Sequence, residues 1–194
     1  MRVAILKYNS GNTASVANAL RRLGIAAEIT DNDAELRTAD KVIFPGVGEA
    51  STAMAYLRNR GLDDTIRSLR QPVLGICLGM QLLCESSEEN STDCLGIVPL
   101  RVRRFPQMGL KVPHVGWNMV RGFRSVLFGG VSNNDFMYFV HGYYVEIGEM
   151  CTARSEYGVS FCSALEFNNF YAVQFHPEKS GEIGERILQN FINL

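Results

Sequence analysis

Cys77 is the residue of this chain best suited to nucleophilic chemistry. It lies in the pentapeptide Gly75-Ile76-Cys77-Leu78-Gly79, where an apolar run meets a helical pattern. Glycines two residues before and after a nucleophile are typical of an elbow, a sharp strand-to-helix turn that presents the side chain at the rim of a sheet. The start of the helix favours a thiolate, and its free amides are suited to hold an oxyanion. The alternative is a small buried cysteine between two packing glycines.

A thiol nucleophile needs a base, and His176 is the best placed of the three histidines. It follows the apolar run at 171–175 and precedes Pro177, which favours an extended backbone at His176. Residues i and i+2 of an extended segment point the same way, so we expect Glu178 to hydrogen-bond one imidazole nitrogen while the other faces the thiol. We interpret the other two histidines as structural residues, and these are His114 and His141.

A glycine-rich turn, Pro45-Gly46-Val47-Gly48, ends the third apolar run of the chain. Such a turn is suited to aim a backbone amide at a developing oxyanion. Phosphate binding is a competing interpretation, but the chain has neither a G-x-G-x-x-G nor a Walker A sequence. A plain strand-to-helix turn is the third interpretation.

The elements that must position these residues follow an alternating pattern. Apolar runs at 2–8, 25–29, 42–44 and 72–76 are separated by helical patterns at 16–23, 54–57 and 62–69, and a further helical pattern covers 78–84. Strands that alternate with helices predict an α/β fold with a mostly parallel sheet, flanked by helices in three layers. Ligands bind such sheets beyond the carboxyl ends of the strands, so we expect the three loops at 9–12, 45–49 and 75–79 to share one rim.

The second half of the chain has a different pattern. Its β-rich runs at 97–103, 137–145, 160–165 and 171–175 predict an antiparallel extension of the sheet, and 181–193 is expected to be a closing helix. Without a linker or repeat, residues 1–194 are expected to form a single domain.

Composition limits the classes of function. A net charge of −1 gives no general attraction for nucleic acid or an anionic membrane, and no apolar stretch approaches the ~20 residues that span a bilayer. Five cysteines without a CxxC pair favour neither a disulfide scaffold nor a zinc site, and we expect the four outside the elbow to be buried thiols. These features predict a cytoplasmic protein without a metal or cofactor.

Taken together, PGVG, GICLGMQ and FHPEKS, in this order and spacing, resemble the class I (triad) glutamine amidotransferases. The resemblance covers essentially the whole chain. Within that family, the segments PHVGWN (113–118) and YFVH (138–141) are similar to the glutaminase subunits of imidazole glycerol phosphate synthases.

The resemblance implies roles for individual residues. Cys77 would attack the side-chain amide of glutamine, His176 would carry the proton, and Glu178 would hold His176. The amides of Leu78 and, after a loop rearrangement, Val47 would stabilise the oxyanion. The residues implied in glutamine binding are Gln81, Glu89 and Tyr143.

The resemblance also implies a partner. The family delivers ammonia to a (β/α)8 cyclase subunit, which makes imidazole glycerol phosphate and an aminoimidazole carboxamide ribotide in histidine biosynthesis. Residues implied at this interface are Asn12, Trp117, Tyr138 and Lys179. Two departures from the family pattern, Asn9-Ser10 in the first loop and Val115 where methionine is common, fall on segments implied to face this partner.

Three other functions remain as alternatives at this point. A triad glutaminase feeding a different ammonia-using synthase is disfavoured by the PHVGWN and YFVH segments. A cysteine peptidase or deglycase is disfavoured by Gln81 and the HPE arrangement, and a catalytically inactive binding module by the intact Cys77, His176 and Glu178.

Overall fold

A computed structural model describes residues 1–133 and 135–194 of the chain. Its main sheet contains strands in the order β2-β1-β3-β4-β13-β12-β10-β7-β5-β6, and β11 pairs with β12. The strands from β2 to β13 in this order are parallel. Their bounds are β1 Val3–Leu6, β2 Ala27–Thr30, β3 Lys41–Gly46, β4 Val73–Cys77 and β13 Phe170–Val173.

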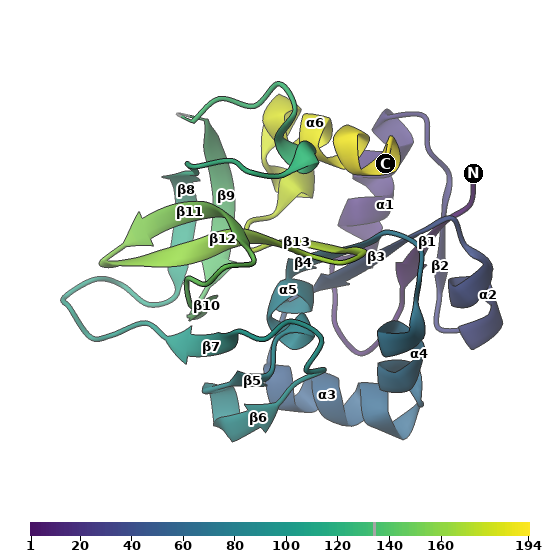
Figure 1. Cartoon of the computed structure of the whole chain (residues 1–194), viewed down its shortest axis with the longest axis horizontal. Coiled ribbons are helices and arrows are strands. Elements are labelled where there is room, and N and C mark those ends of the chain that lie inside the picture. Colours follow the sequence, from purple (N-terminus) through teal and green to yellow (C-terminus); the bar gives the residue numbers. More distant parts are fainter. Residues whose placement is uncertain (134) are drawn as a thin grey trace.

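Helices cover both faces of this parallel region (Figure 1). Helices α1 (Thr13–Arg22) and α6 (Gly181–Ile192) lie together on one side, and α3 (Ala50–Asn59) and α4 (Leu62–Ser68) lie on the other. The short helices α2 and α5 span Asp33–Thr38 and Leu78–Leu83. Strand β1 shows why both faces are covered, because its alternate residues enter two different hydrophobic clusters and all of them are buried.

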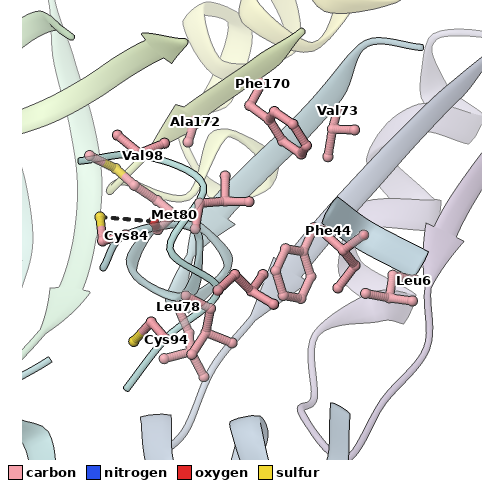
Figure 2. Close-up of a cluster of buried hydrophobic side chains, with 14 of the residues drawn as sticks. Leu6, Phe44, Val73, Leu78, Met80, Cys84, Cys94, Val98, Phe170 and Ala172 are labelled. Carbon is pink, nitrogen blue, oxygen red and sulfur yellow. Dashed lines mark hydrogen bonds between the residues drawn. The ribbon is translucent and has the colours of Figure 1, made fainter. Parts of the chain in front are cut away.

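The cluster on the α3 side packs directly beneath the elbow (Figure 2). Phe44 of β3 is fully buried between Leu6 of β1 and Leu78 at the start of α5. The same cluster includes Met80 and Cys84, so the helix that follows Cys77 is anchored in the core.

The antiparallel extension continues the sheet beyond β13. It contains β12 (Val159–Phe167), β10 (Tyr143–Val145), β7 (Arg101–Arg104) and β11 (Cys151–Tyr157), with the short β5 (Ser86–Ser87) and β6 (Thr92–Asp93) at the edge. Strands β8 (His114–Met119) and β9 (Phe136–His141) form a separate two-stranded antiparallel sheet. Single 3-10 turns lie at η1 (Glu89–Ser91), η2 (Val126–Phe128) and η3 (Pro177–Lys179).

The α/β fold, its mostly parallel sheet and its antiparallel extension are confirmed, with two corrected runs and three missed elements. The predicted run at 137–145 is two strands in two different sheets, because the chain leaves β9 at Gly142 before entering β10. The run at 97–103 is a strand only from Arg101. The strand β8 was missed because glycine and asparagine interrupt its apolar pattern, and the polar β11 and the short α2 were missed as well.

Among the described residues, no helix is both long enough and apolar enough to cross a membrane.

Candidate active site

Cys77 is the last residue of β4 and stands directly before α5. Its backbone has φ 53° and ψ −106°, a conformation that costs free energy for any residue with a side chain. The flanking glycines permit the turn, because a Cβ at Gly79 would overlap the carbonyl oxygen of Phe44, and one at Gly75 would lie 3.0 Å from Leu83. The thiol is 5% exposed and donates a hydrogen bond to the Val140 carbonyl oxygen at 3.6 Å.

His176 and Glu178 form a buried hydrogen-bonded pair. The imidazole Nδ1 donates to the Glu178 Oε1 at 2.8 Å, which leaves Nε2 available to a thiol proton. Burial lowers the pKa of His176, but the adjacent Cys77 thiol and the Glu178 carboxylate outweigh burial and raise that pKa above its ordinary value. The predicted hydrogen bond is therefore present, although its geometry differs from the expectation. His176 is extended, but Pro177–Lys179 form the 3-10 turn η3, which brings Glu178 back to the imidazole.

Asn12 adds a second donor to this pair. Its side-chain amide donates a short hydrogen bond to the Glu178 Oε1 and lies 3.5 Å from the His176 Nδ1. The first loop of the chain thus contacts the histidine–glutamate pair directly.

The turn at Gly46-Val47-Gly48 lies beside the nucleophile, because Gly46 is the β3 partner of Cys77 in the parallel ladder. The Val47 amide is already engaged and donates to the Ser10 hydroxyl at 2.6 Å. The Leu78 amide is at the first position of α5, where a helix offers it no acceptor. Of the two amides implied in oxyanion binding, Leu78 is free of a helical partner and Val47 is held by Ser10.

A cavity of about 210 Å³ opens beside Cys77. Seven of the residues singled out in the sequence line it, namely Val47, Gly48, Cys77, Leu78, Gln81, Glu89 and Tyr143. The remaining lining residues are Pro113, Val140, His141 and Gly142. This part of the wall thus comes from the residue before β8, from the end of β9 and from the β9–β10 connection.

Gln81 is buried, one helical turn after the nucleophile, and its amide is fully oriented. Its Nε2 donates to the Tyr143 carbonyl oxygen and to the Gln174 Oε1, both at 3.0 Å. Gln174, which is completely buried on the chain just before His176, in turn donates from Nε2 to the Cys77 sulfur at 3.6 Å. An amide donor on the sulfur stabilises the negative charge that develops on a nucleophilic thiol.

Glu89 is half-buried and is more than a solvated charge. Its Oε2 accepts a hydrogen bond from the Ala50 amide at the start of α3, at 2.8 Å. Burial raises the pKa of its carboxyl group, and the Ala50 hydrogen bond opposes that shift.

The residues implied at a partner interface lie close to the triad. Trp117 and Tyr138 are paired across β8 and β9, and their rings pack edge to face with centroids 5.9 Å apart. Trp117 is 55% exposed, while the Tyr138 carbonyl accepts the His176 amide at 2.8 Å. Lys179 is exposed directly after Glu178.

Sequence reasoning missed three contributors to this region: Ser10, Gln174 and His141. From the sequence, Ser10 was noted only as a departure from the family pattern, and His141 was interpreted only as a structural residue. The position of Gln174 two residues before His176 is a local signal that could have drawn attention to it.

The remaining cysteines agree with the expectation, since all five thiols of the chain are buried and free. Within residues 1–133 and 135–194, no three His, Cys, Asp or Glu side chains gather as a candidate metal site.

This constellation can be compared with known proteins. The family model described as "Glutamine amidotransferase class-I" matches residues 4–194. The chain belongs to the class I glutamine amidotransferases. This amidotransferase is 55% identical to the imidazole glycerol phosphate synthase subunit HisH of Bacteroides fragilis, over the full length of both chains. It is 45% identical to the subunit HisH of Haemophilus influenzae, over 99% of this chain and 97% of that protein. These identities place the amidotransferase in the HisH family.

Solved structures agree on the fold. A crystal structure of a glutamine amidotransferase superposes with a TM-score of 0.77 at 23% identity, covering 100% of this amidotransferase and 98% of that chain. The structure of PurLQS from Thermotoga maritima gives a TM-score of 0.71 at 17% identity, covering 99% and 97%.

Proposed function

We propose that this amidotransferase is the glutaminase subunit of an imidazole glycerol phosphate synthase. It hydrolyses glutamine to glutamate and ammonia and delivers the ammonia to a cyclase subunit in histidine biosynthesis. The observation that carries the proposal is the full-length identity with HisH subunits, together with a nucleophile elbow that faces a buried His–Glu pair beside a cavity. Residues 1–194 act in this proposal as one glutamine amidotransferase domain, in line with the span of the family match.

In the first half-reaction, the Cys77 sulfur attacks the carboxamide carbon of glutamine, and the thiol proton moves to the His176 Nε2. Glu178 holds the opposite imidazole nitrogen and stabilises the resulting imidazolium. As the tetrahedral intermediate collapses, the carbon–nitrogen bond breaks, and His176 returns its proton to the departing ammonia. A glutamyl thioester on Cys77 remains.

In the second half-reaction, His176 takes a proton from water, which attacks the thioester carbon. Collapse of the second tetrahedral intermediate breaks the carbon–sulfur bond, and the thiol regains a proton as glutamate leaves. Both intermediates carry an oxyanion, which the amides of Leu78 and Val47 stabilise in this proposal. In this proposal the Val47 amide must first leave Ser10, so the orientation held by Ser10 corresponds to a low-activity state.

Glutamine is held by the wall of the cavity in this proposal. Gln81, Glu89 and Tyr143 all line it, and the half-buried Glu89 carboxylate supplies a negative charge that suits the substrate ammonium group.

The outer face of β8 and β9 is the proposed docking face for the cyclase, which is a (β/α)8 barrel. Val115, Trp117 and Phe136 are each more than half exposed there, beside the half-buried Tyr138. A cluster of exposed apolar side chains is typical of an interaction surface, and Trp and Tyr are common anchors. Asn12 and Lys179 contact or adjoin the triad, which suits residues at an ammonia passage between the two proteins. A cytoplasmic location belongs to the same proposal, because free thiols suit a reducing compartment.

The test is glutamate release from glutamine, measured with the chain alone, with the cyclase, and with the cyclase and its phosphoribulosyl substrate. We expect strong activation by the liganded partner and none in Cys77→Ala. Full activity of the chain alone, without any response to that partner, would favour a glutaminase that serves a different synthase.

A further inference from the structure

His114 and His141 are the two histidines that the proposed chemistry does not use, yet they are hydrogen-bonded to each other inside the protein. The His114 Nδ1 lies 3.0 Å from the His141 Nε2, and both side chains are buried. The His141 Nδ1 lies 2.7 Å from the Tyr143 carbonyl oxygen. Since a carbonyl oxygen only accepts, His141 must donate from Nδ1. Burial lowers the pKa of His141 and keeps the ring neutral, so its Nε2 accepts from His114.

The same reasoning fixes the other end of the pair. Because His114 donates from Nδ1, its Nε2 is an acceptor, and the Asn118 amide nitrogen lies 3.4 Å from it. The orientation of Asn118 is set independently, because its Oδ1 accepts the Met119 amide at 2.8 Å and its Nδ2 donates to the Glu156 carbonyl at 2.9 Å. Every donor and acceptor from Asn118 to Tyr143 therefore has one consistent direction.

The Tyr143 carbonyl connects this pair to the nucleophile. It accepts both His141 and the Gln81 amide, and Gln81 in turn sets the orientation in which Gln174 presents its N–H to the Cys77 sulfur. We call this continuous series the amide–histidine chain, and its members are Asn118, His114, His141, the Tyr143 carbonyl, Gln81, Gln174 and Cys77.

The amide–histidine chain begins on the strand that carries the proposed docking face. Along β8, Val115 and Trp117 are exposed on the outer face, whereas His114 is buried on the inner face. At its other end the amide–histidine chain reaches the cavity wall, since Gln81, His141 and Tyr143 all line the cavity.

We propose that the amide–histidine chain positions the wall of the glutamine cavity relative to the Cys77 sulfur, with His114 and His141 as its positioning residues. This inference rests on the proposed function, which it deepens by assigning work to two histidines outside the triad. Each hydrogen bond in the chain is formed by a neutral group with a single forced direction, so loss of one member leaves its neighbours free to turn.

The first experiment reads the tautomers and needs no activity. Long-range ¹H–¹⁵N spectra of the histidine side chains should show His114 and His141 both protonated on Nδ1 and unprotonated on Nε2. Protonation of either ring on Nε2 would reverse the direction of the hydrogen bonds in the amide–histidine chain. That result would overturn the proposal regardless of the enzyme's activity.

The second experiment compares two substitutions of His114 with opposite expectations. The His114 ring stacks on Tyr157 at 4.1 Å and on Phe139 at 5.1 Å between centroids, so His114→Phe retains the packing and removes both hydrogen bonds. His114→Asn loses the packing and retains a donor at the position of Nδ1. The matched control is Tyr157→Phe, which keeps the stacked ring and removes only a hydrogen bond to the Lys111 carbonyl, outside the chain.

The readout is the rate at which Cys77 is labelled by a diazoketone analogue of glutamine, set against its rate with iodoacetamide, which needs no glutamine cavity. We expect His114→Phe to slow the labelling of Cys77 by the glutamine analogue about tenfold, as for the loss of one buried hydrogen bond. Its labelling by iodoacetamide should stay within about twofold of the wild-type rate. The glutamine analogue should label Cys77 faster in His114→Asn than in His114→Phe, although His114→Asn has the lower melting temperature. The labelling rate of Tyr157→Phe should match that of the wild type.

A purely structural role predicts the reverse order, with labelling rates that follow the melting temperatures, and that result would overturn the proposal. Equal labelling of His114→Phe and the wild type would overturn it as well. If the wild type neither releases glutamate nor reacts with the analogue, the proposed function fails. The spectra then still decide whether the amide–histidine chain exists.

Discussion

The Ser10 hydroxyl is hydrogen-bonded to both backbone polar groups of Val47. It accepts the Val47 amide and donates to the Val47 carbonyl oxygen, each at 2.6 Å. Ser10 therefore occupies the donor that we propose for the oxyanion, and it does so from the same first loop in which Asn12 contacts Glu178. One short loop thus touches both the oxyanion turn and the histidine–glutamate pair.

Removing this hydroxyl should release the Val47 peptide. Two hydrogen bonds of about 1 kcal/mol net each hold the resting orientation, so we expect Ser10→Ala to raise glutaminase activity without the partner by up to about 30-fold. The measurement is glutamate release by the isolated chain. Asn9→Ala is the matched control, because Asn9 donates to the Thr52 carbonyl and leaves Val47 untouched. Unchanged basal activity in Ser10→Ala would show that Ser10 does not limit the oxyanion turn.

Replacing Glu178 by glutamine should keep the shape of the triad and remove its charge. The Glu178 carboxylate is one of the groups that raise the pKa of His176, so in Glu178→Gln we expect that pKa to fall. Glutamate release should fall by about 10²-fold to 10⁴-fold, since the imidazolium formed during the reaction loses its counter-charge. Steady-state kinetics with the liganded partner measure the rate, and NMR titration of His176 measures the pKa. An active variant with an unchanged His176 pKa would contradict the role given to Glu178.

The parts of the site that could be predicted from the sequence depend on short-range patterns. The elbow around Cys77 is encoded by two glycines four positions apart, and His176 and Glu178 are two positions apart. The parallel arrangement of the first strands likewise follows from alternating apolar and helical segments. Such features need only local geometry.

The missed features depend on contacts between distant segments. Gln174 meets Gln81 across 93 positions, and Ser10 meets Val47 across 37. His114 and His141 were interpreted as structural because each lacks a partner nearby in sequence, and only the pairing of β8 with β9 brings them together. The periodicity of apolar residues in the sequence does not indicate which polar side chains will lie face to face in the folded sheet.

Gly79 should be among the glycines of this chain least tolerant of alanine. A Cβ there would overlap the Phe44 carbonyl oxygen, which belongs to the backbone of a buried strand and cannot move aside. We expect Gly79→Ala to lower the free energy of unfolding by about 3 kcal/mol or more, measured by urea denaturation. Gly24→Ala is the matched control, because Gly24 has φ +77° with no atom within 4 Å of an added Cβ. It should cost only about 1–2 kcal/mol of left-handed strain. Equal losses in the two variants would show that the close packing behind the elbow relaxes at little cost.

The histidine pair should make the protein sensitive to mild acid. Burial lowers the pKa of His114 to about 4, and mainly burial lowers that of His141 to about 3, whereas both recover an ordinary value near 6.5 in the unfolded chain. Below pH 6.5 these histidines are therefore protonated in the unfolded state and neutral in the folded state. As the pH falls, each histidine lowers the free energy of unfolding by about 1.4 kcal/mol per pH unit until its folded pKa is reached. His114→Phe removes one of these protons. Urea denaturation between pH 6 and pH 5 should then show a slope smaller than that of the wild type by about 1.4 kcal/mol per pH unit, with the carboxyl groups contributing equally to both proteins. Parallel slopes would mean that His114 takes up its proton inside the folded protein.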